Sequence, residues 1–237
     1  MRRHDLHTHT NFSDGRFSPE DLVQLAREKK LKILGICDHA FSKKLLDSYQ
    51  ITTRLEEYLR HLETIQKSLN GLMLRIGIEI DVSKNYGVDP ALLPVDILNQ
   101  FDFVLFEYVN TASEYWGKVG RRSHMEVISI RNQLEIPVGL AHNDIQQNYQ
   151  GKEAEISKIL AQNEIFIELQ QSERGRNTRN GMDYYNHFSQ RLIHSLVENG
   201  VRIVCGTDTH TGEFLGELDD VYQFISQNNL QYHELVM

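Results

Sequence analysis

Seven short apolar runs constrain the fold of this chain more than any other feature of its sequence. Each run is typical of a buried β-strand, ends in polar residues, and in several cases is apolar throughout rather than alternating. Uninterrupted apolar character indicates parallel strands that are covered on both faces. The predicted strands are His4–His7, Lys32–Cys37, Met73–Ile80, Phe103–Phe106, Ile136–Leu140, Ile165–Leu169 and Arg202–Cys205.

Helical segments separate these runs. The first opens at Ser18, a helix-capping residue, followed by Pro19 and two acidic residues, as helix starts prefer. The other predicted helices cover Lys44–Leu69, Ala91–Asn99, His124–Asn132, Lys152–Gln162, Asp183–Asn199 and Glu213–Asn228. Repeated strand–helix units favour parallel pairing through right-handed crossovers. Because no stretch resembles a linker, we expect a single domain over residues 1–237, a closed or nearly closed α/β barrel like a TIM barrel. A doubly wound open sheet is the alternative.

Composition excludes some functions. The chain has 237 residues and a formal net charge of −8, which argues against a broad duplex-DNA footprint, because that favours a basic face. The sequence has no signal-peptide-like region and no apolar run near the ~20 residues of a membrane span, so we expect a cytoplasmic protein. Cys37 and Cys205 fall in predicted strands and form no CxxC motif, so we expect buried free thiols. The sequence leaves the oligomeric state open.

Metal-binding residue types follow five of the seven predicted strands. These clusters are His7-Thr8-His9, Asp38-His39, Glu79, His142 and Asp208-Thr209-His210. In a β/α barrel the active site forms at the carboxyl ends of the strands, so all five clusters would converge on one mouth. Imidazole nitrogen and carboxylate oxygen together suit Zn, Mn or Fe. The sequence therefore predicts a metal centre.

The spacing of these residues favours more than one ion. His7 and His9 are two residues apart, so on an extended strand their side chains share one face. Glu79 can bridge two ions, and Asp208 can add a further oxygen ligand. Two neighbouring divalent ions lower the pKa of a shared water and clamp both oxygens of an in-line displacement. This is the machinery of phosphoester hydrolysis.

Five motifs together resemble a known family. They are Asp5-Leu6-His7-Thr8-His9-Thr10 with Ser13-Asp14-Gly15, Ile36-Cys37-Asp38-His39, Gly77-Ile78-Glu79, Ala141-His142 and Gly206-Thr207-Asp208-Thr209-His210. In order and spacing, over essentially the whole chain, they resemble the PHP (polymerase and histidinol phosphatase) family. The resemblance implies a distorted seven-stranded (β/α)7 barrel, up to three divalent ions and phosphoesterase activity.

The resemblance also implies a ligand set. A first ion would be bound by His7, His9, Glu79 and Asp208. Glu79 would bridge to a second ion, which His142 also binds, and a third would be bound by Asp14, His39 and His210. Asp38 stands beside a ligand and, with Asp5, could orient histidine N–H groups. We count Asp38, His39 and His210 as catalytic candidates, because either histidine could also protonate a leaving group.

Two positions depart from the family pattern. Histidinol phosphatases usually have a histidine where this chain has Gly15, which points away from histidinol phosphate and toward the branch that includes small-nucleotide and oligonucleotide phosphoesterases. After the fourth strand the family usually supplies a histidine ligand, where this chain has Glu107. Either Glu107 replaces that histidine with an oxygen ligand, or it faces elsewhere and leaves the second site weak.

Three arginines follow the sixth strand, at Arg174, Arg176 and Arg179. On a glycine-containing loop at the active-site end, they are candidates to bind a phosphate group through two hydrogen bonds each. Glu168 ends the same strand. It could bind substrate or a histidine, or it could pair with a nearby arginine.

The combined hypothesis is a metal-dependent phosphoesterase with two or three divalent ions (Zn, Mn or Fe). A metal-bridging hydroxide would attack a small phosphorylated substrate or a short oligonucleotide. One alternative is a related amidohydrolase-like enzyme, because the same ions polarise a carbonyl group. The other is a non-catalytic metal-binding scaffold.

Overall fold

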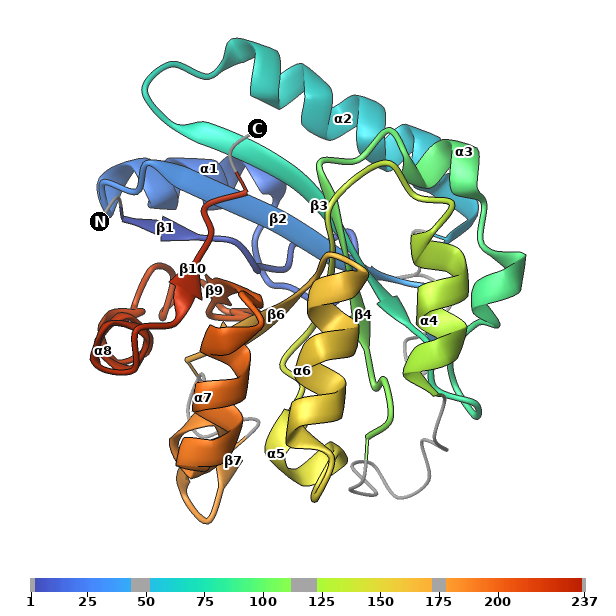
Figure 1. The fold of residues 1–237 in the computed structure, drawn as a ribbon. Coiled ribbons are helices and arrows are strands. Elements are labelled where there is room, and N and C mark those ends of the chain that lie inside the picture. Colours follow the sequence, from blue (N-terminus) through green and yellow to red (C-terminus); the bar gives the residue numbers. More distant parts are fainter. Residues whose placement is uncertain (1–2, 44–51, 112–122, 172–177, 236–237) are drawn as a thin grey trace.

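The computed structural model describes residues 3–43, 52–111, 123–171 and 178–235. Its centre is a sheet of eight parallel strands, in the order β1-β2-β3-β4-β5-β6-β9-β10. The strands are β1 His4–Asp5, β2 Ile33–Ala40, β3 Met73–Asp81, β4 Phe103–Glu107, β5 Val138–Leu140, β6 Ile165–Gln170, β9 Arg202–Gly206 and β10 Gln231–Tyr232. Figure 1 shows that the sheet curls and that helices cover its outer side.

The predicted count of seven strands is wrong, and the barrel is open. The eighth strand, β10, is only two residues long and pairs with the start of β9, so the apolar-run criterion missed it. β1 and β10 are the two edges of the sheet. Three backbone hydrogen bonds also join residues 6–9, after β1, to residues 205–209 at the end of β9. These bonds bring the first and last predicted ligand clusters side by side.

The helices are α1 Pro19–Glu28, α2 Leu55–Ser68, α3 Val95–Leu98, α4 His124–Arg131, α5 Ile145–Asn148, α6 Glu153–Gln162, α7 Gln190–Glu198 and α8 Asp219–Gln227. Ser18 caps α1 as predicted, accepting a hydrogen bond from the backbone N–H of Asp21. The predictions for α4 and α6 differ from the structure by one residue at an end.

Four predicted helices start too early or run too far, each for a local reason. Pro94 interrupts Ala91–Asn99, leaving a 3₁₀ turn and the four-residue α3. Gly216 adopts a left-handed φ of 72°, and α8 follows it. Ser189 caps α7, so this helix starts later than predicted. The residues before it form a short hairpin (β7 Thr178–Arg179 and β8 Met182–Asp183) and a 3₁₀ turn. The prediction over 44–51 lies outside the described residues, and α2 begins at Leu55.

The apolar core has two parts. The larger part lies between the sheet and the helices, and the smaller fills the interior of the curled sheet around Phe103 and Phe166. Each ring packs against a glycine on a neighbouring strand, Gly77 for Phe103 and Gly139 for Phe166, where a Cβ atom would collide with the ring. The two rings thus form an apolar floor for the polar residues at the strand ends.

Both cysteines are buried free thiols, as predicted. Among the described residues, no helix combines the length and apolar character that crossing a membrane requires.

Candidate metal centre

A first group of ligand atoms comes from the ends of β1, β3 and β9. Nε2 of His9 lies 3.1 Å from Nε2 of His7 and 2.7 Å from Oδ1 of Asp208. Oε2 of Glu79 lies 3.4 Å from His7 Nε2 and 3.6 Å from His9 Nε2. All four side chains are less than a tenth exposed. The structure therefore brings together the four residues predicted for the first ion.

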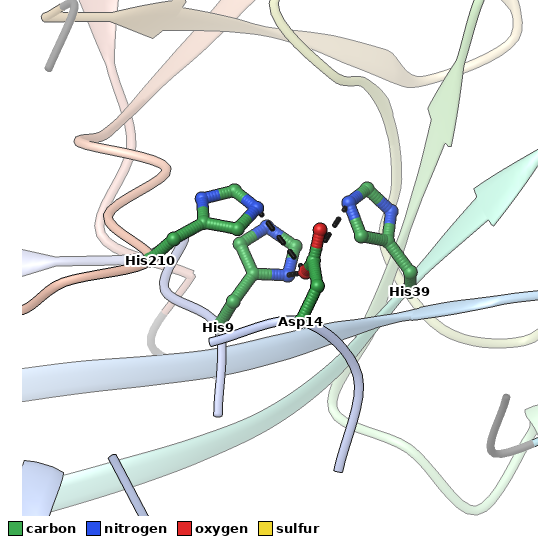
Figure 2. A group of neighbouring side chains, drawn as sticks. All are labelled: His9, Asp14, His39 and His210. Atoms are coloured by element: carbon green, nitrogen blue, oxygen red, sulfur yellow. Dashed lines mark ion pairs between the residues drawn. The ribbon is translucent and has the colours of Figure 1, made fainter. Parts of the chain in front are cut away.

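A second group surrounds Asp14, which stands on the loop after β1 (Figure 2). Oδ1 of Asp14 lies 3.2 Å from Nε2 of His210 and 3.9 Å from both Nδ1 of His9 and Nε2 of His39. The side chain of Asp14 is one-third exposed, whereas the histidines are almost buried. Asp14, His39 and His210 were predicted together, and the structure adds His9.

Glu79 connects the groups because its two oxygens face different histidines. Oε1 lies 3.1 Å from Nε2 of His142. Oε2 faces His7 and His9 and lies 2.8 Å from Nδ1 of His39. This arrangement is what a bridging carboxylate requires.

Glu107 faces the site. Its residue is 1 % exposed, and Oε1 lies 3.5 Å from Nδ1 of His39. The register of the parallel strands explains this position. His39 on β2 pairs with Glu79 on β3, and Asp81, two residues further along β3, pairs with Glu107 on β4. His39, Glu79 and Glu107 form a third group whose ligand atoms lie within 4.8 Å of one another.

The residues fit divalent metal ions on two counts. Among the described residues, Nδ1 of His9 is a buried atom without a hydrogen-bond partner. Buried polar atoms are rarely left unpaired in proteins. The donor set of imidazole nitrogen and carboxylate oxygen is also one that Zn, Mn and Fe accept.

Proximity shifts the pKa values of His39, His142 and Glu79 toward their charged forms. Burial alone would lower the pKa of His39, but the charges of Glu79 and Glu107 raise it to about 10. Burial likewise opposes protonation of His142, whose hydrogen bond to Glu79 raises its pKa to about 9. Burial disfavours ionisation of Glu79, yet the nearby His39 and His7 hold its pKa well below the ordinary value. These neighbours thus keep Glu79 ionised.

Two of the ligands have unusual backbones. His142 and Asp208 adopt positive φ angles of 31° and 52°. Such conformations are uncommon for residues other than glycine, and strain of this kind concentrates at functional sites. The left-handed turn lets each side chain point into the mouth directly after its strand ends.

Neighbouring polar groups fix the orientation of the ligands. Oε1 of Glu168 lies 2.8 Å from Nδ1 of His7, and its Oε2 accepts a hydrogen bond of 2.9 Å from the backbone N–H of His142. Among the sequence alternatives for Glu168, these contacts favour binding a histidine. Gln170, which sequence reasoning missed, donates a hydrogen bond of 2.8 Å to Oδ2 of Asp208. Gln170 ends β6, so its position at a strand end, like that of the predicted site residues, is the sequence feature that could have identified it.

Asp38 contacts a loop rather than a histidine. Its carboxylate accepts hydrogen bonds from the backbone N–H of Thr10 (2.7 Å), the Thr10 hydroxyl (2.7 Å) and the Ser13 hydroxyl (2.5 Å). These bonds hold the segment that carries Asp14. The catalytic role of Asp38 stays a prediction, and its contacts favour positioning.

Asp5 also departs from the expected role. Its carboxylate accepts hydrogen bonds from the backbone N–H groups of His7, Thr207 and Gly216 and from the Thr207 hydroxyl. Burial raises the pKa of Asp5 to about 6, against these hydrogen bonds, which lower it. Asp5 therefore holds the chain before Asp208 rather than a histidine ring.

Of the three predicted substrate-binding arginines, only Arg179 lies within the described residues; Arg174 and Arg176 do not. Nη1 of Arg179 lies 3.1 Å from Oδ2 of Asp144, which caps α5 two residues after His142. The hairpin of β7 and β8, which carries Arg179, therefore lies near the carboxyl ends of the strands. The guanidinium is about a quarter exposed.

The fold and site define a class: a parallel β/α protein with a histidine–carboxylate cluster at the carboxyl ends of its strands. The chain belongs to the PHP domain family, whose model matches residues 5–172.

Its relatives span most of its length. It is 27% identical over 230 residues to "Uncharacterized protein MJ1295" of Methanocaldococcus jannaschii. The aligned region covers 93% of this chain and 86% of that protein. It is 27% identical over 240 residues to "Probable phosphatase" of Acetivibrio thermocellus, with 98% and 89% covered.

The fold matches that of a histidinol phosphate phosphatase from Lactococcus lactis, whose crystal structure contains zinc, L-histidinol and phosphate. The TM-score is 0.66 at 17% identity, with 98% of this chain and 95% of that chain covered.

Proposed function

We propose that this protein is a metal-dependent phosphoesterase. The single observation that carries the proposal is the position of Glu79, whose oxygens face His142 on one side and His7, His9 and His39 on the other. A carboxylate between two groups of histidines suits a pair of divalent ions. Family membership and relatives named as phosphatases support the same chemistry.

Different residues of the site would hold different ions. His7, His9, Glu79 and Asp208 would hold one ion, and Glu79 with His142 would contribute to a second. Ions bound there would supply an activated water and neutralise the charge that develops on the phosphoryl group.

Protein groups outside this set would keep the ligands in place. Glu168 fixes the ring of His7, and Gln170 fixes the carboxylate of Asp208. Holding reacting groups in a near-productive geometry removes an entropic barrier from the reaction. Arg179 lies near the mouth and would orient the phosphate, and His210 would supply a proton to the leaving group.

The proposed substrate is a small phosphate ester. The relative from Acetivibrio thermocellus is named a probable phosphatase, and the protein of similar fold from Lactococcus lactis is named a histidinol phosphate phosphatase. Gly15 still distinguishes this chain from the pattern of histidinol phosphatases. A nucleotide or short oligonucleotide therefore stays within the proposal.

The test combines metal content with turnover. The purified protein is analysed for bound metal and assayed on p-nitrophenyl phosphate and bis-p-nitrophenyl phosphate with added Mn²⁺ or Zn²⁺. We expect two or three ions per chain and turnover of at least one compound. Asp208→Asn should lose both, whereas His194→Gln, which changes an exposed histidine of α7, should keep both.

Other outcomes assign other functions. Bound metal without turnover of either compound, but with hydrolysis of amides or lactones, would make the protein a non-phosphate hydrolase. Bound metal without turnover of any of these compounds would support a non-catalytic metal-binding scaffold, and absence of both metal and turnover would refute the proposal. Preference for the monoester or the diester would select between a phosphatase and a phosphodiesterase.

A further inference from the structure

Three neighbouring loops at the carboxyl ends of the strands each carry an exposed cationic residue. Arg16 follows β1, Lys43 follows β2 and Lys84 follows β3. Within the described part of the chain, none of these three side chains forms a hydrogen bond or an ion pair. Adjacent strands lie about 4.8 Å apart, and β1, β2 and β3 are adjacent in the sheet, so the three loops begin within ~10 Å of one another.

The chain contains more than enough carboxylates to pair with these cations. It has 33 acidic and 25 basic residues. Arg179, on the hairpin after β6, pairs with Asp144. Arg16 has Asp14 two residues before it, with a side chain one-third exposed, yet the two form no ion pair. An arginine left unpaired in this setting is available to an anion that comes from outside the protein.

The first loop is held against the candidate metal centre. Gly15 packs so closely on the backbone of His9 that a Cβ atom would collide with the His9 carbonyl oxygen. The backbone N–H of Arg16 donates a hydrogen bond of 2.7 Å to the carbonyl oxygen of His210. The carboxylate of Asp38 fastens the same loop to the end of β2. The backbone at Arg16 is therefore fixed beside two candidate metal ligands.

The second and third loops are joined to each other. The backbone N–H of Lys43 donates a hydrogen bond of 2.7 Å to the carbonyl oxygen of Tyr86. The hydroxyl of Ser42 donates one of 2.8 Å to Oδ2 of Asp81, at the end of β3. Lys84 lies between Asp81 and Tyr86 in the sequence. The backbone positions of all three cations are thus set before a ligand binds, which lowers the entropic cost of binding.

We infer that Arg16, Lys43 and Lys84 form a cationic rim that binds a second negatively charged group of the substrate. The inference rests on the phosphoesterase function proposed above. The candidate metal centre would take the phosphoryl group that is cleaved, and the cationic rim would take a phosphate or carboxylate on the leaving group. The preferred substrates would then carry at least two anionic groups.

The cationic rim would act mainly through charge. Arginine binds phosphate or carboxylate through two parallel hydrogen bonds, whereas lysine acts as a point charge. Exposed charges attract one another over about 10 Å at 0.1 M ionic strength, and added salt weakens the attraction. The advantage of a second anionic group should therefore be largest in dilute buffer.

The test uses phosphate esters of alkanediols of increasing length. Each bisphosphate is compared with its matched monophosphate, with Mn²⁺ or Zn²⁺ added and release of inorganic phosphate as the readout. For the wild type, kcat/KM should be at least ~10-fold higher for the best bisphosphate, beyond the factor of about two that two equivalent phosphates give. The triple variant Arg16→Gln, Lys43→Gln, Lys84→Gln should lose most of this ratio. Added salt should lower the wild-type ratio more than that of the variant.

The matched control removes three exposed cations elsewhere. Arg27→Gln, Lys32→Gln and Lys158→Gln together change the net charge by the same amount and lie outside the three loops. This protein should keep the wild-type ratio. Elemental analysis and thermal unfolding should give the wild-type number of ions and the wild-type unfolding temperature for both triple variants. Loss of an ion in the rim variant would make these residues supports of the metal centre and overturn the inference.

A carboxyalkyl phosphate of the best length identifies the group that is bound. A gain in kcat/KM equal to that of the bisphosphate would assign recognition of charge alone, and a smaller gain would assign a second phosphate; both support the inference. A ratio no higher than about twofold at every length, or the same ratio in the wild type and the rim variant, would overturn the inference and leave the proposed function intact. Absence of turnover of every monophosphate and of p-nitrophenyl phosphate would instead refute the proposed function on which the inference rests.

Discussion

Nδ1 of His7 lies 2.8 Å from Oε1 of Glu168, and this contact decides which nitrogen of His7 faces the centre. With Nδ1 donating to the carboxylate, Nε2 carries the free lone pair, and it points toward His9, Glu79 and Asp208. A carboxylate that orients a ligating histidine also makes it a stronger donor. Glu168 therefore forms part of the candidate metal centre although it need not touch an ion.

Glu168→Gln should weaken metal binding about 10- to 100-fold, the usual effect of losing such a partner. The amide would place a donor against either His7 or the backbone N–H of His142, so one of the two contacts is lost. Titration of metal-free protein against a competing chelator measures the affinity. Glu135→Gln, an exposed glutamate, is the control. Unchanged affinity in Glu168→Gln would contradict the orienting role.

Asp38→Asn separates a positioning role from acid–base catalysis. The amide keeps the shape of the group and can still accept from the Thr10 backbone N–H and the Ser13 hydroxyl. We therefore expect a loss of kcat below about tenfold, because general acid–base residues contribute roughly 10²- to 10⁴-fold. Steady-state kinetics over a range of pH is the measurement. A loss of 10²-fold or more with an altered pH profile would make Asp38 catalytic, as predicted from the sequence.

Sequence reasoning predicted this cluster because its residues follow apolar strands. The strand ends near His7, Glu79, His142 and Asp208 could be read from the sequence, and parallel strands place their carboxyl ends together. The same reasoning missed β10, since a two-residue edge strand has no apolar pattern. It also ended β2 at Cys37, although the strand continues to Ala40 and carries His39 within the sheet.

The details of the centre depend on contacts that sequence spacing does not encode. Which nitrogen of His39 faces Glu107 follows from the ladder register and the ring orientation. The partners of Asp38 and Asp5 are loop atoms that lie up to about 200 residues away along the chain, as for Asp5 and Thr207. Such long-range pairs form only after the sheet curls.

Arg179→Gln and Asp144→Asn together test the role of Arg179. If the guanidinium binds phosphate, Arg179→Gln should raise KM about 10- to 100-fold, the worth of one or two charge-assisted hydrogen bonds. Asp144→Asn should change KM much less, because it removes the partner and leaves the guanidinium in place. If the pair only docks the hairpin, both variants should lower the unfolding temperature equally and leave KM alone. The measurements are substrate kinetics and thermal unfolding on the same preparations.

The stability of the metal-free protein should fall as the pH rises through 9 to 10. The pKa values of His142 and His39 in the folded protein are about 9 and about 10, above the ordinary value of 6.5. A histidine whose pKa is raised on folding binds its proton more tightly in the folded state. Its contribution is therefore complete below about pH 6.5 and is lost as the pH passes its folded-state pKa.

Bound metal should remove this decline. An ion takes the place of the protons on the imidazoles, so its affinity rises with pH and the loaded protein keeps its unfolding temperature in alkaline buffer. Unfolding temperatures of chelator-treated and metal-loaded protein, measured from pH 6 to pH 10, provide the comparison. Parallel curves for the two forms would mean that His39 and His142 are not protonated in the metal-free site. Diverging curves above about pH 8, with proton release on metal addition at pH 7.5, would place both histidines among the groups that exchange protons for metal.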